Sequence, residues 1–296
     1  MPMQDYFNTQ RPRLLAIAYR MLGTRADAED LVQDAWLRWH AADTAALQSA
    51  EAWLVTVTTR LCIDRLRTLR SEREHYVGPW LPEPLLDIAS PAATPEQVVE
   101  LASDVSIAFL AVLERLTPDE RAAFLLREVF DFDYAEVAAM LDREEASCRQ
   151  LVHRAKARVR DERPRVHVSR DAHQSLLERF CAATRSGERA ALQALFAADA
   201  QFVADGGGKV LSVLKVLHGA ERIVRFFEVL ARRLGNRMSY RHASINGEPG
   251  LLRYVDGQLD AVLSLITDGE QIHACYIVRN PDKLAAIATE HATLPS

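Results

Sequence analysis

The stretch that decides the fold is residues 117–160, TPDERAAFLLREVFDFDYAEVAAMLDREEASCRQLVHRAKARVR. It opens on a helix-start signal in which Thr117 is the N-cap, proline follows at the first helical position, and a glutamate three residues on completes a capping box. Asp133 predicts the start of a short helix over 134–141, and a turn then leads into a basic helix over 145–160. This order of elements is typical of a helix-turn-helix.

The basic helix has two different faces. At 100° per residue, Cys148, Val152, Ala155 and Val159 fall on one side and should pack on the preceding helices. Polar and basic side chains that could reach base edges or phosphates occupy the other side and its flank. They are Ser147, Arg149, Gln150, His153 and Arg154. An arginine-rich helix that simply faces water has the same pattern, so this helix alone leaves both interpretations open.

Residues 1–75 predict helices throughout. Apolar residues recur at helical spacing over 11–22, over 26–39 and from Ser49 to about residue 73. The second helix has an acidic side on which Asp30, Gln33 and Asp34 share a face. Such a face usually meets water, but beside a basic partner it becomes a docking surface.

The third helix carries several arginines beside a tryptophan. Trp53, Arg60, Arg65 and Arg67 would suit single-stranded DNA, with cations along the backbone and an aromatic ring near an unstacked base. The alternative is that Trp53, spaced helically with Val57 and Leu61, belongs to the core.

The clearest domain boundary in the chain is a segment rich in proline and acidic residues. Residues 78–95 hold five of the twelve prolines, and residues 76–113 hold five acids and no base. Proline restricts its own φ and the conformation of the preceding residue, so a helix cannot run through here. We predict a semi-rigid, extended linker over 76–112, with a second helical domain over 113–165.

Beyond residue 169 the pattern changes to α+β, and we place this third domain at 170–290. Two helical stretches precede segments with strand character at 200–203 and 210–217, and a helix over 220–234 follows. Four further strands are predicted between residues 238 and 278, with a hairpin turn at Asp268-Gly269.

Composition excludes several classes of protein. With 49% hydrophobic residues and a net charge of −5 the chain is neither low in complexity nor globally basic. It has no run of about 20 apolar residues and no apolar export signal. Its four cysteines are widely spaced. We therefore expect a cytoplasmic protein without membrane contact, disulfide framework, metal or cofactor.

Two sets of motifs resemble the sigma-70 family. Residues 28–36 (AEDLVQDAW) look like the region 2 helix that binds core RNA polymerase, and residues 53–67 look like the helix that reads and melts the −10 element. Residues 116–121 (LTPDER) with the helix-turn-helix look like region 4, which reads the −35 element. The resemblance implies that Asp30, Gln33 and Asp34 bind polymerase. It also implies roles for the third helix, with the loop 42–50, at the −10 element, and for the basic helix at the −35 element.

With a short linker and no other recognisable regions, the chain resembles the extracytoplasmic-function (ECF) subgroup. One position departs from that subgroup, since Arg60 stands where many members have asparagine. Three further motifs resemble the subset of ECF factors with a fused SnoaL-like domain, which is thought to regulate the sigma core in place of a separate anti-sigma protein. The motifs are Trp80-Leu81-Pro82-Glu83-Pro84, Asp205-Gly206-Gly207-Gly208-Lys209 and Asn280-Pro281-Asp282-Lys283.

The resemblance therefore implies a multidomain, non-enzymatic transcription initiation factor. Two all-α sigma domains would be followed by an α+β SnoaL-like cone, and the partners would be core RNA polymerase and promoter DNA. The alternative is that the third domain senses a small molecule or is a SnoaL-like isomerase or cyclase. Acid–base candidates for such chemistry are Asp205, His218, His242, Tyr254 and His273, although no spacing ties any two of them into a pair.

Overall fold

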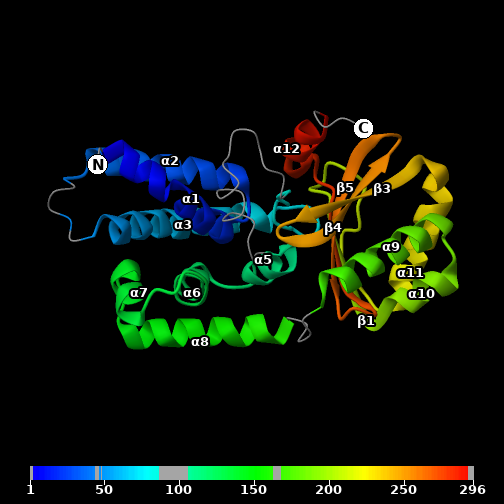
Figure 1. Cartoon of the computed structure of the whole chain (residues 1–296). Helices are drawn as coiled ribbons and strands as arrows, with labels where there is room; N and C mark the ends of the chain where they lie inside the picture. The colour runs from blue at the N-terminus through cyan, green and yellow to red at the C-terminus, as the bar shows by residue number, and fades with distance from the viewer. Residues whose placement is uncertain (1–2, 44–46, 48, 87–105, 163–167, 293–296) are drawn as a thin grey trace. The chain divides into compact units, whose positions relative to one another are not determined.

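The computed structural model describes residues 3–43, 47, 49–86, 106–162 and 168–292, and they form two compact units. The N-terminal unit contains the described residues up to 75 together with 109–162. The C-terminal unit contains 76–86, 106–108 and 168–292. Figure 1 shows helices in the first unit and a sheet with helices in the second. The predicted order of fold classes, all-α domains followed by an α+β domain, is confirmed.

Three helices open the N-terminal unit: α1 (Met3–Leu22), α2 (Arg25–Ala41) and α3 (Ala50–Glu74). The helix α1 packs on both others and buries an unbroken run from Leu14 to Leu22. The hydroxyl of Ser49 accepts a hydrogen bond from the amide of Ala52 at 3.2 Å and caps α3. The helix start predicted at Ser49 is therefore correct, and serine is a favoured N-cap.

The helix α1 begins at Met3, eight residues before the predicted start, and contains Pro12. Its first turns are held by aromatic contacts with α2. The ring of Phe7 lies 4.9 Å from that of Trp36, and the indole of Trp39 donates to the carbonyl of Met3 at 3.2 Å. These partners lie more than 25 residues away, so a local pattern could not reveal them.

The second helical part contains α5 (Ile107–Leu113), α6 (Pro118–Phe124), the π-helical turn η2 (Leu125–Val129), α7 (Tyr134–Leu141) and α8 (Glu145–Glu162). Both predicted starts, at Thr117 and Asp133, are complete capping boxes. Asp142 ends α7 in the left-handed conformation with φ 54°, a geometry that aspartate tolerates. The helix α5 occupies residues that we assigned to the linker, and residues 87–105 of that linker lie outside the described part of the chain.

The C-terminal unit is one mixed sheet with helices. Its strand order is β2-β1-β6-β5-β4-β3, in which β1 and β6 are parallel and the other neighbours antiparallel. The strands are β1 (Phe196–Asp205), β2 (Leu217–His218), β3 (Met238–Ile245), β4 (Glu248–Val255), β5 (Gln258–Thr267) and β6 (Ile272–Val278). The helices are α9 (Arg170–Ser186), α10 (Arg189–Leu195), α11 (Ala220–Leu234) and α12 (Pro281–Ala292), with the 3-10 turn η3 (Gly235–Arg237) between α11 and β3.

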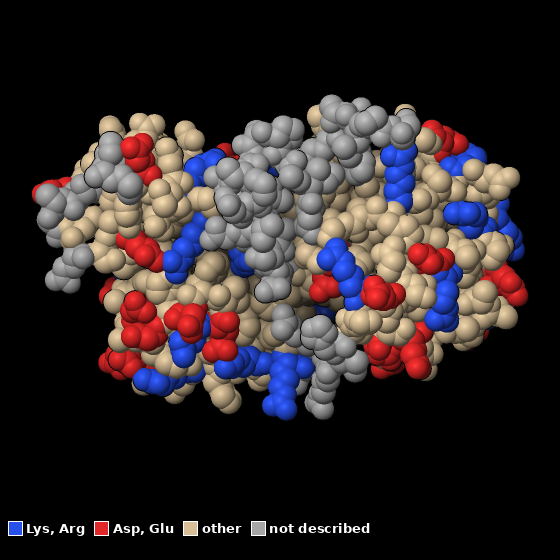
Figure 2. Space-filling view, in the orientation of Figure 1, with Lys and Arg blue, Asp and Glu red and all other residues tan. Residues whose placement is uncertain are grey.

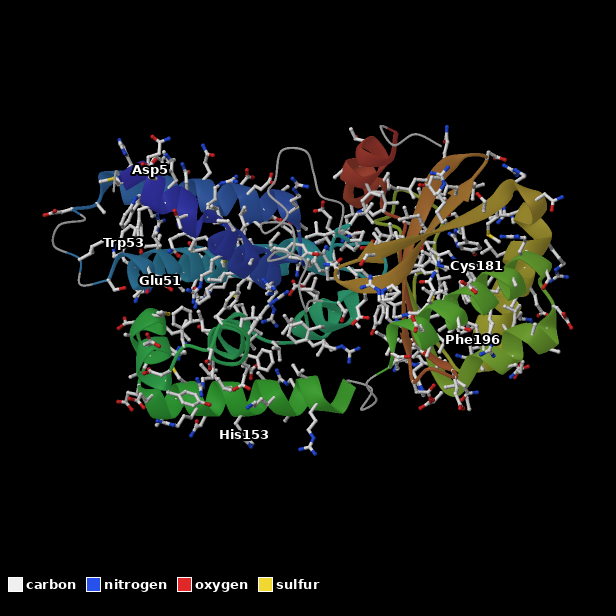
Figure 3. All side chains as sticks on the ribbon, in the orientation of Figure 1. Asp5, Glu51, Trp53, His153, Cys181 and Phe196 are labelled. Atoms are coloured by element: carbon white, nitrogen blue, oxygen red, sulfur yellow. The ribbon has the colours of Figure 1, made fainter. Side chains whose placement is uncertain are left out.

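Phenylalanine rings fill the interior between the sheet and α9 and α11. Phe180 and Phe227 lie 5.2 Å apart, and Phe196 and Phe202 pack on Phe227 at 6.0 and 5.7 Å. Figure 3 labels Phe196 and Cys181 in this region. Burial of such rings is the main source of stability for the sheet.

The predicted strand at 210–217 is wrong, because only Leu217 and His218 pair with β1. The amides of Lys209 and Val210 turn back to the carbonyl of Gly206, and the side chain of Arg279 donates to the carbonyl of Leu211. These tertiary bonds hold the segment as a loop, with Leu211 76% exposed. The helix α12 was not predicted.

Candidate nucleic-acid interface and linker site

The helix α8 has the two faces that its sequence predicts. Cys148, Leu151, Val152, Ala155 and Val159 are buried, and α8 packs on α6 and α7. Gln150 and His153 are exposed, and Figure 3 shows His153 on the side of α8 away from α6. Figure 2 shows Lys and Arg side chains gathered along α8. This face could present hydrogen-bonding groups to a groove of duplex nucleic acid.

Arg149 lies at the flank of that face and is held at the start of α8. Its guanidinium lies 4.5 Å from the ring centroid of Tyr134 and pairs with Glu145 at 2.7 Å. Its side chain is 58% exposed, so it remains accessible to a phosphate. The neighbouring Ser147 is half-buried.

Arg154, which we predicted to contact DNA, has a protein partner. It pairs with Glu120 of α6 at 3.2 Å, and Arg158 pairs with the same carboxylate at 2.7 Å. Burial opposes ionisation of Glu120, but hydrogen bonds from Thr117 and the charges of Arg158 and Arg154 lower its pKa. These pairs join α8 to the first turn of α6. Arg154 therefore positions α8 while its side chain stays 58% exposed.

The four residues predicted for the −10 element all lie on α3 and all contact protein. Trp53 is half-buried with its ring 5.6 Å from Trp39, and Figure 3 labels it beside Glu51 at the start of α3. Arg65 pairs with Asp27 at 2.9 Å and Glu72 at 3.2 Å.

Arg67 pairs with Asp64 at 3.1 Å and Asp119 at 3.8 Å. Arg60 donates to carbonyls at the end of α7. None of these partners was foreseen from the sequence. Of the loop 42–50, residues 44–46 and 48 lie outside the described residues.

The acidic side of α2 is exposed as predicted, and Asp30, Gln33 and Asp34 share it. The sequence analysis missed Leu37, which is 58% exposed one turn further along the same face. A single exposed leucine is common on protein surfaces, so the acidic side chains remain the main feature of this face. In the sequence, the position of Leu37 three residues after Asp34 would have placed it on the same face of the helix.

In the C-terminal unit, three stretches meet around the carboxylate of Asp205, which is fully buried. It accepts hydrogen bonds from the hydroxyl of Tyr76 at 2.6 Å, the amide of Leu81 at 2.9 Å and the ammonium of Lys283 at 2.7 Å. Burial and then the bond to Asp205 raise the pKa of the Tyr76 phenol, which therefore stays protonated as a donor. We call Tyr76, Trp80, Leu81, Asp205, Asn280 and Lys283 the linker site.

Lys283 is the buried cation of the linker site. Its ammonium lies 4.0 Å from the ring centroid of Trp80 and also donates to the carbonyl of Leu81. The amide of Asn280 donates to the Tyr76 hydroxyl at 2.9 Å. The proline-rich segment is thus tied to β1 by hydrogen bonds from Tyr76 and Leu81 to Asp205. It is tied to α12 by the Lys283 hydrogen bond to Leu81 and by cation–π contacts of Lys283 with Trp80 and, at 5.2 Å, with Tyr76.

The segment continues along the end of β3. Leu81, Pro82, Pro84 and Leu86 are buried, and Glu83 is half-buried. The amide of Leu85 donates to the side chain of Asn246 at 2.9 Å, and the amide of Asn246 returns a bond to the carbonyl of Leu85 at 2.9 Å. The sequence analysis missed Tyr76 and Asn246. The Asn-Gly pair at 246–247 indicated only a turn.

Two of the three glycines permit close approach to this segment. Gly207 (φ 61°) leaves 2.4 Å between a hypothetical Cβ and the Asn280 amide nitrogen, and Gly208 (φ 70°) leaves 3.0 Å to Val77. Only glycine fits both the conformation and the space. Lys209, which follows these glycines, pairs with exposed Asp282 at 2.5 Å.

The acid–base candidates of the C-terminal unit are dispersed. His242 bonds to Gln174 at 3.0 Å, His273 pairs with Asp268 at 2.9 Å, and Asp205 belongs to the linker site. Among the described residues no group of three His, Cys, Asp or Glu could hold a metal ion. In the same part of the chain no helix is long and apolar enough to cross a membrane.

Comparison with known proteins agrees with this geometry. Residues 6–72 match the model of sigma-70 region 2, and residues 106–159 match that of sigma-70 region 4. The chain is similar to the ECF RNA polymerase sigma factor SigJ of Mycobacterium tuberculosis, with 37% identity over 290 residues that cover 94% of this chain and 91% of that protein.

The probable ECF RNA polymerase sigma factor SigI of the same species is 28% identical over 292 residues, which cover 98% of this chain and 97% of that protein. The crystal structure of M. tuberculosis SigJ superposes with a TM-score of 0.76 and 35% identity, over 95% of this chain and 98% of that chain.

Proposed function

Because the chain belongs to the ECF sigma factors of the sigma-70 family, which bind core RNA polymerase and direct transcription initiation, we propose which of its residues make these contacts and how they are controlled. The face of α2 with Asp30, Gln33 and Asp34 binds core polymerase, and Leu37 adds an apolar contact. The C-terminal unit regulates initiation in cis through the linker site.

For the −35 element, we assign base contacts to Gln150 and His153 and phosphate contacts to Arg149. The exposed face of α8, opposite its buried apolar side, supports this assignment. Arg154 contributes mainly by holding α8 on α6 through Glu120. For the −10 element, Trp53, Arg60, Arg65 and Arg67 form the contact surface of α3 once their protein partners release them.

Regulation rests on one observation, the docking of residues 76–86 around Asp205 and Lys283. These eleven residues are the first part of the connection between α3 and α5. Fully extended, they could span about 36–40 Å, and docking fixes them on the C-terminal unit. A proline-stiffened segment loses little entropy when it docks, which favours the bound state. The bound segment therefore limits how far the two DNA-binding parts can separate.

The test is run-off transcription with core enzyme on templates with randomised −35 and −10 elements. Asp205→Asn should change the amount of transcript while the preferred sequences stay the same. Asp282→Asn, which removes the exposed pair with Lys209, is the matched control. Equal transcription by both variants and the unmodified chain would remove the regulatory role from the linker site.

The interior of the C-terminal unit bears on the alternative function, sensing or turnover of a small molecule. Phe180, Phe196, Phe202 and Phe227 pack on one another and fill the described interior between the sheet and its helices. As a sigma factor the protein is an initiation factor and not an enzyme.

A further inference from the structure

A cleft opens in the C-terminal unit between α11 and the turn that joins α9 to α10. The three helices pack on one another and lie together in Figure 1. The cleft has a volume of about 450 Å³, which falls in the range of small-molecule sites. It shares no residue with the linker site or with the surfaces proposed for DNA and polymerase. Its lining includes three arginines, one glutamate and one serine, which are Arg189, Arg225, Arg232, Glu228 and Ser186.

The backbone holds the walls of the cleft in place. Gly187 ends α9 with φ 68°, and a Cβ at this position would lie 2.8 Å from the Cβ of Ala231 on α11. Glycine therefore lets the end of α9 approach α11 more closely than another residue could. The hydroxyl of Ser186 accepts a hydrogen bond from the amide of Glu188 at 3.2 Å, which fixes the turn into α10. The cleft is thus built into the fold.

Glu228, the acid in the lining, is neutralised by Arg189 of α10. The two side chains pair at 2.9 Å, and Arg189 also lies 3.8 Å from Glu221. The side chain of Glu228 is 22% exposed and that of Arg189 is 53% exposed, so the guanidinium covers the carboxylate and remains accessible itself. The carboxylate that would repel an anion is therefore already paired.

Arg225 and Arg232 carry the remaining charge of the cleft. They are seven residues apart, so they lie on the same side of α11, about 10 Å apart along its axis. Both are exposed, and within the described part of the chain neither pairs with a carboxylate. The Nε of Arg232 donates to the backbone carbonyl of Glu228 at 3.4 Å, which holds the side chain along α11 on the Arg225 side. Three arginines against one glutamate give the lining a net charge of +2.

We propose that this cleft binds a phosphate-bearing small molecule. A guanidinium presents paired donors that match two oxygens of a phosphate. A phosphate monoester carries a charge of about −1.5 to −2 at pH 7, which balances the charge of the lining, whereas a single carboxylate leaves part of it uncompensated. Arg225 and Arg232 bind the phosphate oxygens from α11, and Arg189 approaches from α10. The volume fits a ligand of nucleotide size.

The test is isothermal titration calorimetry of the full chain with inorganic pyrophosphate and with adenosine diphosphate, at an ionic strength kept constant with sodium chloride. We expect saturable binding of one ligand per chain with a Kd of about 1 mM or tighter. Arg225→Gln with Arg232→Gln should weaken binding about tenfold or more, because both uncompensated guanidiniums are gone. Absence of saturable binding of both ligands by the unmodified chain would overturn the proposal.

The matched control is Arg222→Gln with Arg233→Gln. It removes two exposed charges from the same helix, at positions outside the lining of the cleft. The Kd of this control should stay within about twofold of that of the unmodified chain, because only long-range attraction is lost. An equal loss of affinity in the two double variants would show a general effect of charge and would refute the site.

A second measurement locates the ligand without a variant. Phenylglyoxal modifies accessible arginines, and mass spectrometry identifies the ones that react. Pyrophosphate should protect Arg225 and Arg232 while Arg222 and Arg233 continue to react, and equal protection of all four would contradict the proposal.

A DNA duplex separates this site from a nucleic-acid surface. If Arg225→Gln with Arg232→Gln weakens binding of a duplex that carries the −35 element but leaves pyrophosphate binding unchanged, the arginines serve DNA and the proposal is wrong. All these titrations are made without polymerase, so a failure of transcription initiation would count against the proposed function alone.

Discussion

Asp205→Asn is the sharpest test of the linker site. One carboxylate oxygen accepts from Tyr76 and from the amide of Gly207, and the other accepts from Lys283 and the amide of Leu81. Asparagine keeps the size and one acceptor, but its amide nitrogen must face two donors, or the side chain must leave them unpaired. The side chains of Asp205 and Lys283 are 0% and 8% exposed, so the lost charge leaves a buried cation.

Removing one partner of a buried pair costs about 3–5 kcal/mol. For a unit of this size that loss corresponds to a Tm lower by roughly 10–15 °C. We expect this change in the calorimetric transition of the C-terminal unit in the full chain. Amide exchange over 76–86 should accelerate in parallel, because the donor of Leu81 loses its acceptor.

The control is Asp282→Asn, whose pair with Lys209 has side chains 62% and 53% exposed and should contribute at most about 1 kcal/mol. The double variant Asp205→Asn with Lys283→Met should recover part of the loss, since the unpaired cation is gone. If both single variants lower the Tm equally and exchange over 76–86 is unchanged, the carboxylate does not hold the segment and the reasoning is refuted.

Three other changes have defined outcomes. Gln150→Ala should reduce the free-energy difference between the preferred and other bases at one −35 position by about 1–3 kcal/mol, measured by equilibrium binding to promoters mutated at that position. The salt dependence of the binding constant should not change. Asp133→Ala removes the capping box of α7 and should lower the free energy of unfolding by about 1 kcal/mol in urea titrations, whereas Glu144→Ala should not. Asp268 accepts hydrogen bonds from the amide of Gln271 and from His273, which lower its pKa from 3.8 to about 2. Its ionised form therefore stabilises the fold above pH 4 and this contribution disappears as pH falls toward 2, so Asp268→Asn should flatten that part of the stability–pH curve measured by thermal unfolding.

The helical half was predictable because its signals are local. Ser49, Thr117 and Asp133 cap helices through atoms three residues away, and the two faces of α8 follow from its period alone. The strand expected at 210–217 failed for the opposite reason. Its residues have strand propensity, but bonds from Arg279 and the turn at Gly206 decide their conformation, and propensity does not include such partners.

The candidate sites show the same division. The resemblance placed Asp205, Trp80 and Lys283 in one set of regulatory motifs. The structure was needed to show that Lys283, and not Lys209, is the buried cation. Arg60 was expected at DNA from its place on α3, but its partner lies 80 residues away in α7. Long-range pairing of this kind leaves no periodic trace in one sequence.

The burial of all four cysteines has a consequence for how the protein responds to its surroundings. Desolvation raises the pKa of every thiol, and that of Cys181 reaches about 11. At neutral pH such a thiol is ionised in only about one molecule in ten thousand, and the thiolate is the form that peroxide attacks. Peroxide should therefore leave the four thiols of the folded protein unmodified, so cysteine oxidation does not provide it with a redox switch.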